Sequence, residues 1–261
     1  EAREHSKSCV NVISSSSLEY AKKPISSSKP IHKKIIKLLP FLAFGSIRLI
    51  STKLINYQEH VSEYGVHWNF FYTLALVVVS SSLIRGYFNI HTPLISWAPL
   101  LCFHQFILGH GHLQEYIENA PRSCNDNGSF LCNFFAANRE GILGSIGYLI
   151  IFLACEDIAK YCIWNVKSKQ SSTQGMRICQ VTIIFWILHF CLATILDIQV
   201  SRRSTNSTFI VWSIAHNMAI LFMIWASFHC TSLKRKAINP PIFDAVNNHG
   251  LIVFILANLM T

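Results

Sequence analysis

The fold is decided by apolar stretches such as Gly141-Ile-Leu-Gly-Ser-Ile-Gly-Tyr-Leu-Ile-Ile-Phe-Leu-Ala-Cys155, which contains no charged residue. As an α-helix this stretch measures about 22 Å, and its apolar character continues to about residue 164. Similar segments lie at about 35–55, 66–84, 94–112, 178–200, 208–230 and 248–261. None of them alternates polar and apolar residues with the period of two that membrane strands show. We therefore expect an all-α, polytopic bundle of transmembrane helices with about seven spans.

The composition agrees with a membrane protein. Of 261 residues, 51% are hydrophobic and 13% are charged, and the mean hydropathy is +0.36. Soluble domains carry about 25% charged residues. The net charge of +9 would suggest nucleic acid in a soluble protein, but the basic residues lie mostly between the apolar segments. We therefore interpret the charge as a topology signal and expect no nucleic-acid partner.

The N-terminal part of the chain differs in character from the rest. Residues 1–34 are polar, basic and rich in serine and lysine, a composition that predicts a flexible loop. Residues 35–261 form the expected helical region. The chain begins at Glu1 without an initiator Met and ends within the apolar run 251–261. We expect it to be the C-terminal half of a longer membrane protein.

Orientation follows from counting Lys and Arg on each side of seven crossings. One side carries 16 of these residues and the other carries 6, so the positive-inside rule assigns the first side to the cytoplasm. Two glycosylation sequons, at Asn127 and Asn206, fall on the second side. Cys124 and Cys132 share one loop on that side and could form a disulfide if the loop is lumenal.

Polar residues next to the apolar segments are the candidate binding groups, because the membrane makes charge costly. Arg139 offers a planar fork that suits phosphate or carboxylate, and Arg202 and Arg203 form an adjacent pair on the second side. Each also fits a structural role: a helix cap, a headgroup anchor or an interhelical hydrogen bond. The candidates are His67, Asn69, Asn138, Arg139, Glu140, Arg202, Arg203 and Asn217.

Searches for known catalytic and cofactor motifs find none. His110 and His112 are two residues apart and cannot share a helix face, and no third ligand joins them at a spacing typical of zinc. The sequence contains no GxSxG, P-loop, GxGxxG or HxxxxD pattern. We expect no metal and no cofactor.

One stretch of the chain resembles a known family. Glu63-Tyr-Gly-Val-His-Trp-Asn-Phe-Phe-Tyr-Thr-Leu74, preceded by Tyr57-Gln-Glu-His-Val-Ser62, closely resembles a signature of the glycosylphosphatidylinositol (GPI) inositol acyltransferases, the PIG-W family. Three further stretches follow in that family's order. They are Ala137-Asn-Arg-Glu-Gly141 with Gly147-Tyr148, then Arg202-Arg203 with Trp212 and Asn217, and then Leu256-Ala-Asn-Leu-Met-Thr261.

The resemblance implies a multi-pass enzyme of the endoplasmic reticulum membrane. Such enzymes move a fatty acyl group, typically palmitoyl, from the co-substrate acyl-CoA to the inositol of glucosaminyl-phosphatidylinositol. The family's proposed catalytic carboxylate and lysine lie in the N-terminal half, so the catalytic residues of this chain are unknown. The chain departs from the family pattern after Arg203 and at residues 154–161, which are more charged than expected.

In this interpretation the chain supplies binding groups for the glycolipid, acyl-CoA and membrane lipid. Arg139, Arg202 and Arg203 would hold phosphates, the asparagines would contact polar headgroups, and His67 would be a supporting base. Two other functional classes stay open: a transporter or channel half, and a non-catalytic truncated copy. The sequence identifies no protein partner.

Overall fold

The computed structural model describes residues 38–54, 61–87, 92–124, 129–164, 171–230, 246, 248–250 and 252–253. Every regular element in these ranges is a helix, which confirms the all-α prediction. The expected loop at 1–34 and most of the segment at 248–261 lie outside the described residues. The helices are α3 (Leu39–Leu54), α4 (Val61–Tyr64), α5 (Phe70–Ser82), α6 (Ala98–His110), α7 (Leu113–Asn119), α8 (Phe130–Ala137), α9 (Arg139–Ala159), α10 (Ser171–Phe190) and α11 (Ser207–Cys230). Three π-helical turns continue α5, α9 and α10: η1 (Leu83–Tyr87), η2 (Lys160–Trp164) and η3 (Cys191–Ile195).

Three helices within the described ranges are long and apolar enough to cross a membrane. They are Arg139–Trp164, Ser172–Ile195 and Ser207–Ser227, and Phe70–Gly86 is a shorter apolar helix. The 13 residues of α6 extend only about 20 Å, less than the roughly 30 Å of a hydrocarbon core. The structure therefore supports a membrane bundle with several candidate spans, while the expectation of seven stays a prediction.

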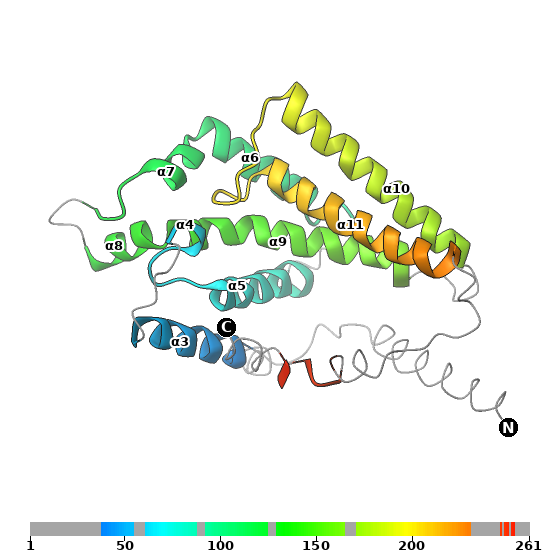
Figure 1. The fold of residues 1–261 in the computed structure, drawn as a ribbon. Coiled ribbons are helices and arrows are strands. Elements are labelled where there is room, and N and C mark those ends of the chain that lie inside the picture. Colours follow the sequence, from blue (N-terminus) through cyan, green and yellow to red (C-terminus); the bar gives the residue numbers. More distant parts are fainter. Residues whose placement is uncertain are drawn as a thin grey trace. The chain divides into compact units, whose positions relative to one another are not determined.

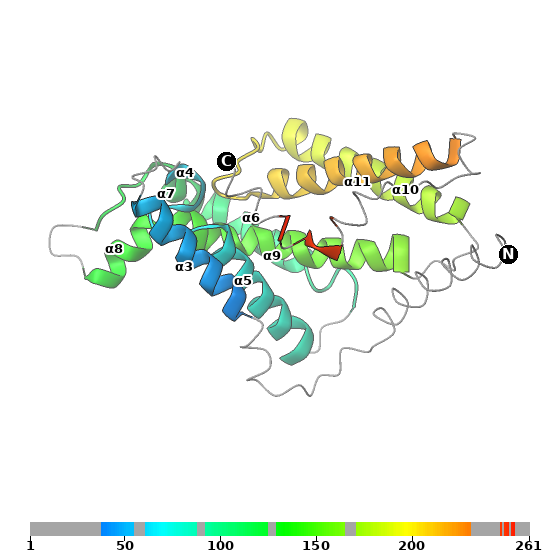
Figure 2. The ribbon, with the colours of Figure 1, turned by 60° about the horizontal axis from the view of Figure 1, so that its bottom comes forward.

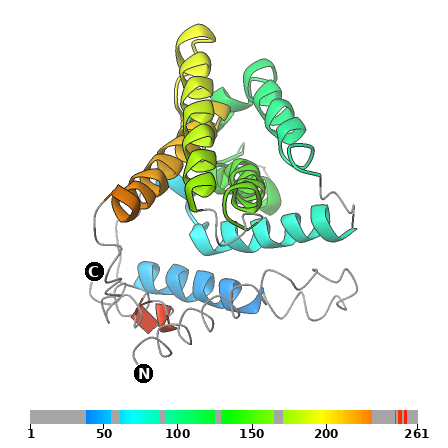
Figure 3. The same cartoon turned by 90° about the vertical axis from the view of Figure 1, so that its right-hand side faces the viewer.

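The chain divides into two compact units, Glu1–Ala219 and Ile220–Thr261. In the first unit α9 is the central helix, and α4, α5, α6, α7 and α8 all contact it. Figure 3 looks almost along α9, with α5 on one side and α6 and α10 on the other. The fully buried side chains of Ile150 and Leu153 lie in this middle layer. Figure 1 and Figure 2 show that α4, α7 and α8 gather at the N-terminal end of α9.

Glycines on α9 allow other segments to approach its backbone. A Cβ added to Gly147 would lie 2.6 Å from Thr205 Cβ, and one added to Gly141 would lie 2.5 Å from the Tyr64 carbonyl oxygen. Both distances are shorter than atoms tolerate. The glycines of the run 141–147 therefore bring the segments around Tyr64 and Thr205 against the N-terminal part of α9.

A cluster of charged residues lies at the C-terminal end of α9. Arg85 Nη2 is 2.9 Å from Asp157 Oδ1, and Arg85 Nε is 3.3 Å from Glu156 Oε2. Ser96 Oγ donates to Asp157 Oδ2 at 3.1 Å. Lys160 pairs with Glu156 one helical turn away, as the i,i+4 spacing predicts. The unusual charge of residues 154–161 is thus compensated by Arg85, which reaches it from η1.

Candidate functional site

The segment before α5 lies on the N-terminal end of α9. Val66 N donates to the Ala137 carbonyl at 3.1 Å, and His67 N donates to Asn138 Oδ1 at 2.7 Å. Gly65 has a φ of +109°, which favours glycine, and this turn brings the two segments together. The His67 side chain itself is exposed. The structure therefore places the His67 backbone beside the Asn138 side chain.

The two asparagines of this region hold the backbone in place. Asn69 is the N-cap of α5 and accepts from Phe71 N and Tyr72 N. Its amide also donates to the Gly45 carbonyl at 2.8 Å, which connects α5 to α3. Asn138 donates to the Phe134 carbonyl at 2.8 Å. Both side chains are buried and bind backbone groups, so the structure supports a role in positioning the backbone.

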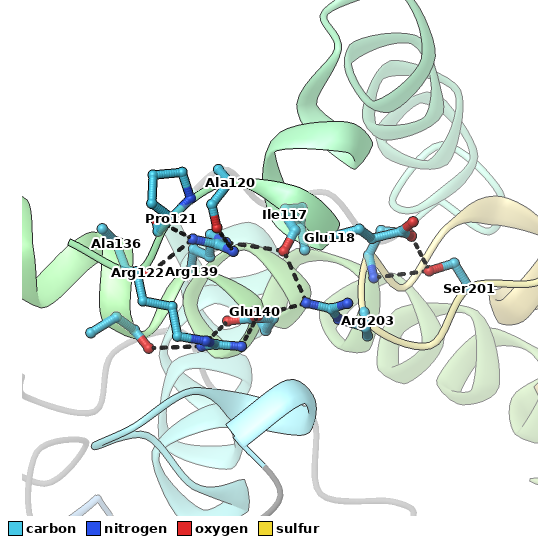
Figure 4. A network of polar contacts seen from close by, with 12 residues as sticks. Ile117, Glu118, Ala120, Pro121, Arg122, Ala136, Arg139, Glu140, Ser201 and Arg203 are labelled. Carbon is cyan, nitrogen blue, oxygen red and sulfur yellow. Dashed lines mark hydrogen bonds and ion pairs between the residues drawn. The ribbon is translucent and has the colours of Figure 1, made fainter. Parts of the chain in front are cut away.

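Arg139 is buried and its donors point at protein carbonyls. Nε donates to Ile117 at 3.0 Å, and Nη1 donates to Pro121 at 2.7 Å. A further bond goes from Nη2 to the Ala120 carbonyl, and the guanidinium lies 5.5 Å from the centre of the Tyr116 ring. These carbonyls lie at the C-terminal end of α7, where helix acceptors have no partner of their own. Arg139 therefore fastens α7 to α9 (Figure 4), and its expected phosphate contact stays a prediction.

Glu140 is a fully buried carboxylate between two arginines. Arg122 Nη2 is 2.7 Å from Oε1 and Arg122 Nη1 is 3.2 Å from Oε2. Arg203 Nη2 approaches Oε1 at 3.2 Å (Figure 4). A buried carboxylate is strongly unfavourable unless cations pair with it. Glu140 is thus the anchor that aligns Arg122 and Arg203.

Arg202 makes a separate, more exposed pair. Its two terminal nitrogens lie 3.0 and 3.4 Å from the two carboxylate oxygens of Glu63. The neighbouring Tyr64 is half-buried, and its burial and the nearby Tyr148 raise the pKa of its hydroxyl, against the opposing effect of Arg202. Arg202 thus connects the stretch around Glu63 to the turn before α11.

We call Arg122, Arg139, Arg202 and Arg203, with Glu63 and Glu140, the arginine cluster. It holds two more arginines than carboxylates. The side chains of Arg122, Arg203 and Arg202 are 32%, 36% and 53% exposed, so three guanidinium groups reach the surface. Partly exposed guanidinium groups in excess over carboxylates can bind a phosphate. No group of His, Cys, Asp or Glu suited to a metal ion occurs among the described residues.

Asn217 lies away from the arginine cluster. Its amide donates to the Ser213 carbonyl of its own helix at 2.7 Å, and its side chain is exposed. It follows Ser207 by about 15 Å along α11. The structure therefore does not bring Asn217 to the arginine cluster.

The structure adds Arg122 and Glu63 to the residues that the sequence predicted. Arg122 and Arg139 are the two basic residues of the loop 113–140. The positive-inside rule already accounts for an arginine in a loop of a membrane protein. The sequence therefore gives no reason to pair Arg122 with Glu140. The Cys124–Cys132 disulfide, which the sequence allowed, is present and closes the loop beside Arg122. Asn133 Oδ1 supports it by accepting from Cys124 N at 2.8 Å.

Comparison with known protein families shows the family to which this chain belongs. The family model described as GWT1 matches residues 6–261. The chain belongs to the GWT1 family. This agrees with the resemblance of Glu63–Leu74 to the PIG-W signature.

Curated members of the GWT1 family are similar over most of this chain. The GPI-anchored wall transfer protein 1 of Yarrowia lipolytica is 34% identical over 254 residues, covering 89% of this chain and 51% of the relative. The phosphatidylinositol-glycan biosynthesis class W protein of Dictyostelium discoideum is 33% identical over 224 residues, covering 85% and 42%. The Debaryomyces hansenii GPI-anchored wall transfer protein 1 is 31% identical over 274 residues, covering 95% and 53%. The chain thus spans about half the length of the curated relatives it matches.

Proposed function

We propose that this chain is the substrate-binding half of a GPI inositol acyltransferase of the endoplasmic reticulum membrane. The reaction moves a fatty acyl group from acyl-CoA to the inositol of glucosaminyl-phosphatidylinositol. Membership of the GWT1 family supports this proposal, as do the names of the relatives, which refer to GPI anchoring and phosphatidylinositol-glycan biosynthesis. Acyl-CoA is a co-substrate, and no cofactor is required.

The observation that carries the proposal is the arginine cluster at the N-terminal end of a membrane-length helix. α9 with η2 is a candidate span, and Arg139 and Glu140 are its first two residues. Arg122, Arg202 and Arg203 therefore lie at the depth at which a lipid phosphate lies when its acyl chains are in the bilayer. The excess positive charge of the cluster suits the phosphodiester of the glycolipid.

We further propose that the cluster faces the lumen, in a bundle that crosses the membrane about seven times. The distribution of Lys and Arg supports this orientation. The Cys124–Cys132 disulfide also supports it, because disulfides persist in the oxidising lumen. Exposed apolar side chains of α8, such as Phe130 and Leu131, suit a position at the headgroup boundary.

The chemistry assigns different tasks to different groups. The inositol hydroxyl oxygen attacks the thioester carbonyl, a base takes the hydroxyl proton, and the CoA thiolate leaves as the ester forms. Hydrogen-bond donors must stabilise the oxyanion of the transition state. We expect the base in the N-terminal half. In this half, Arg202, Arg203 and Arg122 would hold the phosphate, and Asn69, Asn138 and Arg139 would keep that surface in place.

The test uses membranes that lack the endogenous enzyme. Full-length protein containing this chain should transfer labelled palmitoyl from palmitoyl-CoA to glucosaminyl-phosphatidylinositol, and the 261-residue chain alone should not. A full-length protein that is well expressed but transfers no acyl group would contradict the proposal and favour a non-catalytic copy. Movement of the glycolipid across the membrane without acylation would favour a transporter.

A further inference from the structure

The turn before α11 concentrates buried polar atoms without partners. Within the part of the chain that the structure describes, Arg203 Nε, Ser204 Oγ and Ser207 Oγ make no hydrogen bond, and neither does His104 Nε2. The residues Ser204, Ser207 and His104 are at least 97% buried. Buried polar groups in proteins nearly always have a partner, because an unpaired one is unfavourable. Four such atoms in one place therefore require an explanation.

Contacts show that these atoms belong to one place. Ser207 N donates to Oε1 of Gln105 at 2.9 Å, which fastens the start of α11 to α6. His104 precedes Gln105, and its ring interacts with the backbone of Thr205 and Ser204 through hydrogen bonding. The turn is also attached to α9, because Thr205 Oγ1 donates to the Gly144 carbonyl at 3.1 Å. Helices α6, α9 and α11 thus enclose the unpaired atoms.

The turn itself is held in a strained conformation. Thr205 has a φ of +46°, which is rare for a β-branched residue. The close approach of Thr205 to Gly147 and its hydrogen bond to the Gly144 carbonyl hold it there. Such strain is retained where the surrounding structure fixes it, and it is frequent at ligand sites.

The electrostatic surroundings favour a ligand that carries negative charge. The turn leads into the N-terminus of the 24-residue helix α11, which has a partial positive charge. Arg203 lies in the turn and extends its Nη2 to Glu140. The unpaired hydroxyls and the imidazole therefore lie directly beside the part of the arginine cluster that can contact a phosphate.

We propose that Ser204, Ser207 and His104, with Nε of Arg203, bind the ring hydroxyls of the polyol whose phosphate the arginine cluster holds. We call these four residues the hydroxyl subsite. The proposal rests on the proposed function, in which the polyol is inositol. Serine hydroxyls and a neutral imidazole can each donate or accept, as ring hydroxyls also can. An acyl chain has no hydrogen-bonding group for these side chains. A phosphate mainly accepts hydrogen bonds, so it would use the donors of the subsite and leave its accepting oxygen and nitrogen atoms unpaired.

The first test separates a binding role from a structural one in the full-length enzyme. The double substitution Ser204→Ala and Ser207→Ala removes hydroxyls that have no protein partner. We expect an unchanged Tm, a KM for glucosaminyl-phosphatidylinositol raised about tenfold, and an unchanged KM for palmitoyl-CoA. The matched control is Thr208→Val, which lies one residue further and removes a hydroxyl that donates to the Ile198 carbonyl at 2.9 Å. The control should lower Tm and leave both KM values unchanged.

The second test measures binding without catalysis. Purified full-length protein should bind inositol 1-phosphate about tenfold more tightly than inorganic phosphate. The Ser204→Ala, Ser207→Ala variant should bind both about equally. Phosphatidylinositol in micelles, compared with the soluble inositol phosphate, shows whether the acyl chains add to this affinity.

Several outcomes would overturn the hydroxyl subsite. One is a wild-type protein that binds the two phosphates equally. Another is a double variant whose Tm falls as that of Thr208→Val does, while its KM for the glycolipid stays unchanged. That result would indicate that the two serines have a structural role and bind internal water. Normal acyl transfer without an inositol preference would contradict the subsite alone. An inositol preference in a protein that transfers no acyl group would contradict only the proposed function.

Discussion

Arg139 and Arg203 are both associated with Glu140, but they use their guanidinium groups differently. Arg139 is its neighbour in sequence and donates to backbone carbonyls, whereas Arg203 pairs with its carboxylate and stays partly exposed. The sequence could predict that both arginines matter, because each lies beside an apolar segment. It could not separate their roles, since the partners of Arg139 come from residues 117–121 and depend on how α7 packs.

Replacing Arg139 tests its role as a fastening between helices. In Arg139→Lys, a single ammonium replaces a fork that reaches carbonyls of α7 and of the turn after it. We expect a loss of about 3 kcal/mol of stability, because buried acceptors lose their partners. Thermal unfolding in detergent measures this. A variant as stable as the wild type, with a raised KM for the glycolipid, would show instead that Arg139 contacts substrate.

Replacing Gly147 tests the close approach of the turn. Gly147→Ala would place a methyl group 2.6 Å from Thr205 Cβ, so the strained turn must move. We expect about 1–3 kcal/mol of destabilisation and a weaker affinity for inositol phosphate. Gly109→Ala is the matched control, because nothing lies within 4 Å of the added atom and alanine favours a helix. Equal effects of the two substitutions would contradict the packing argument.

Helix α9 connects two charged clusters at its opposite ends. Its 21 residues extend about 30 Å between Arg139 and Ala159. The apolar runs predicted the positions of the long helices well, because a membrane helix needs little more than length and hydrophobicity. The short helices α7 and α8 were not predicted, since the loop 113–140 has no periodic apolar pattern. Their positions are held by the Arg139 contacts and by the Cys124–Cys132 disulfide.

A pair of substitutions tests the ion cluster at the C-terminal end of α9. Arg85→Leu alone leaves Asp157 buried without its 2.9 Å partner, so we expect a loss of about 3–5 kcal/mol. Adding Asp157→Leu should restore much of that loss, because no buried charge is then left unpaired. Thermal unfolding of both single variants and the double variant measures the coupling. Additive losses would show that the two residues act independently.

The disulfide gives a test of topology at the level of one loop. If the loop that contains it is lumenal, Cys124 and Cys132 should resist maleimide labelling until a reductant is added. The test compares intact microsomes with and without dithiothreitol. Labelling of both cysteines before reduction would contradict the lumenal orientation of the arginine cluster.

The whole chain holds the arginine cluster and the other candidate binding residues, and it spans about half the length of its relatives. The helical class and the family were predictable, because composition and one signature stretch carry them. The site was predictable in part. The sequence places His67, Asn138 and Arg203 far apart, and only the packing of α4 and of the turn before α11 against α9 brings them to one end of that helix.

Binding of the glycolipid phosphate by the arginine cluster is tested by acyl-transfer kinetics of the full-length enzyme with Arg203→Gln. Arg122 still pairs with Glu140 in this variant, so the fold should be retained. We predict a glycolipid KM raised by about tenfold or more, an unchanged KM for palmitoyl-CoA and a similar Tm. An unchanged glycolipid KM in a well-folded variant would show that the cluster does not bind the glycolipid phosphate.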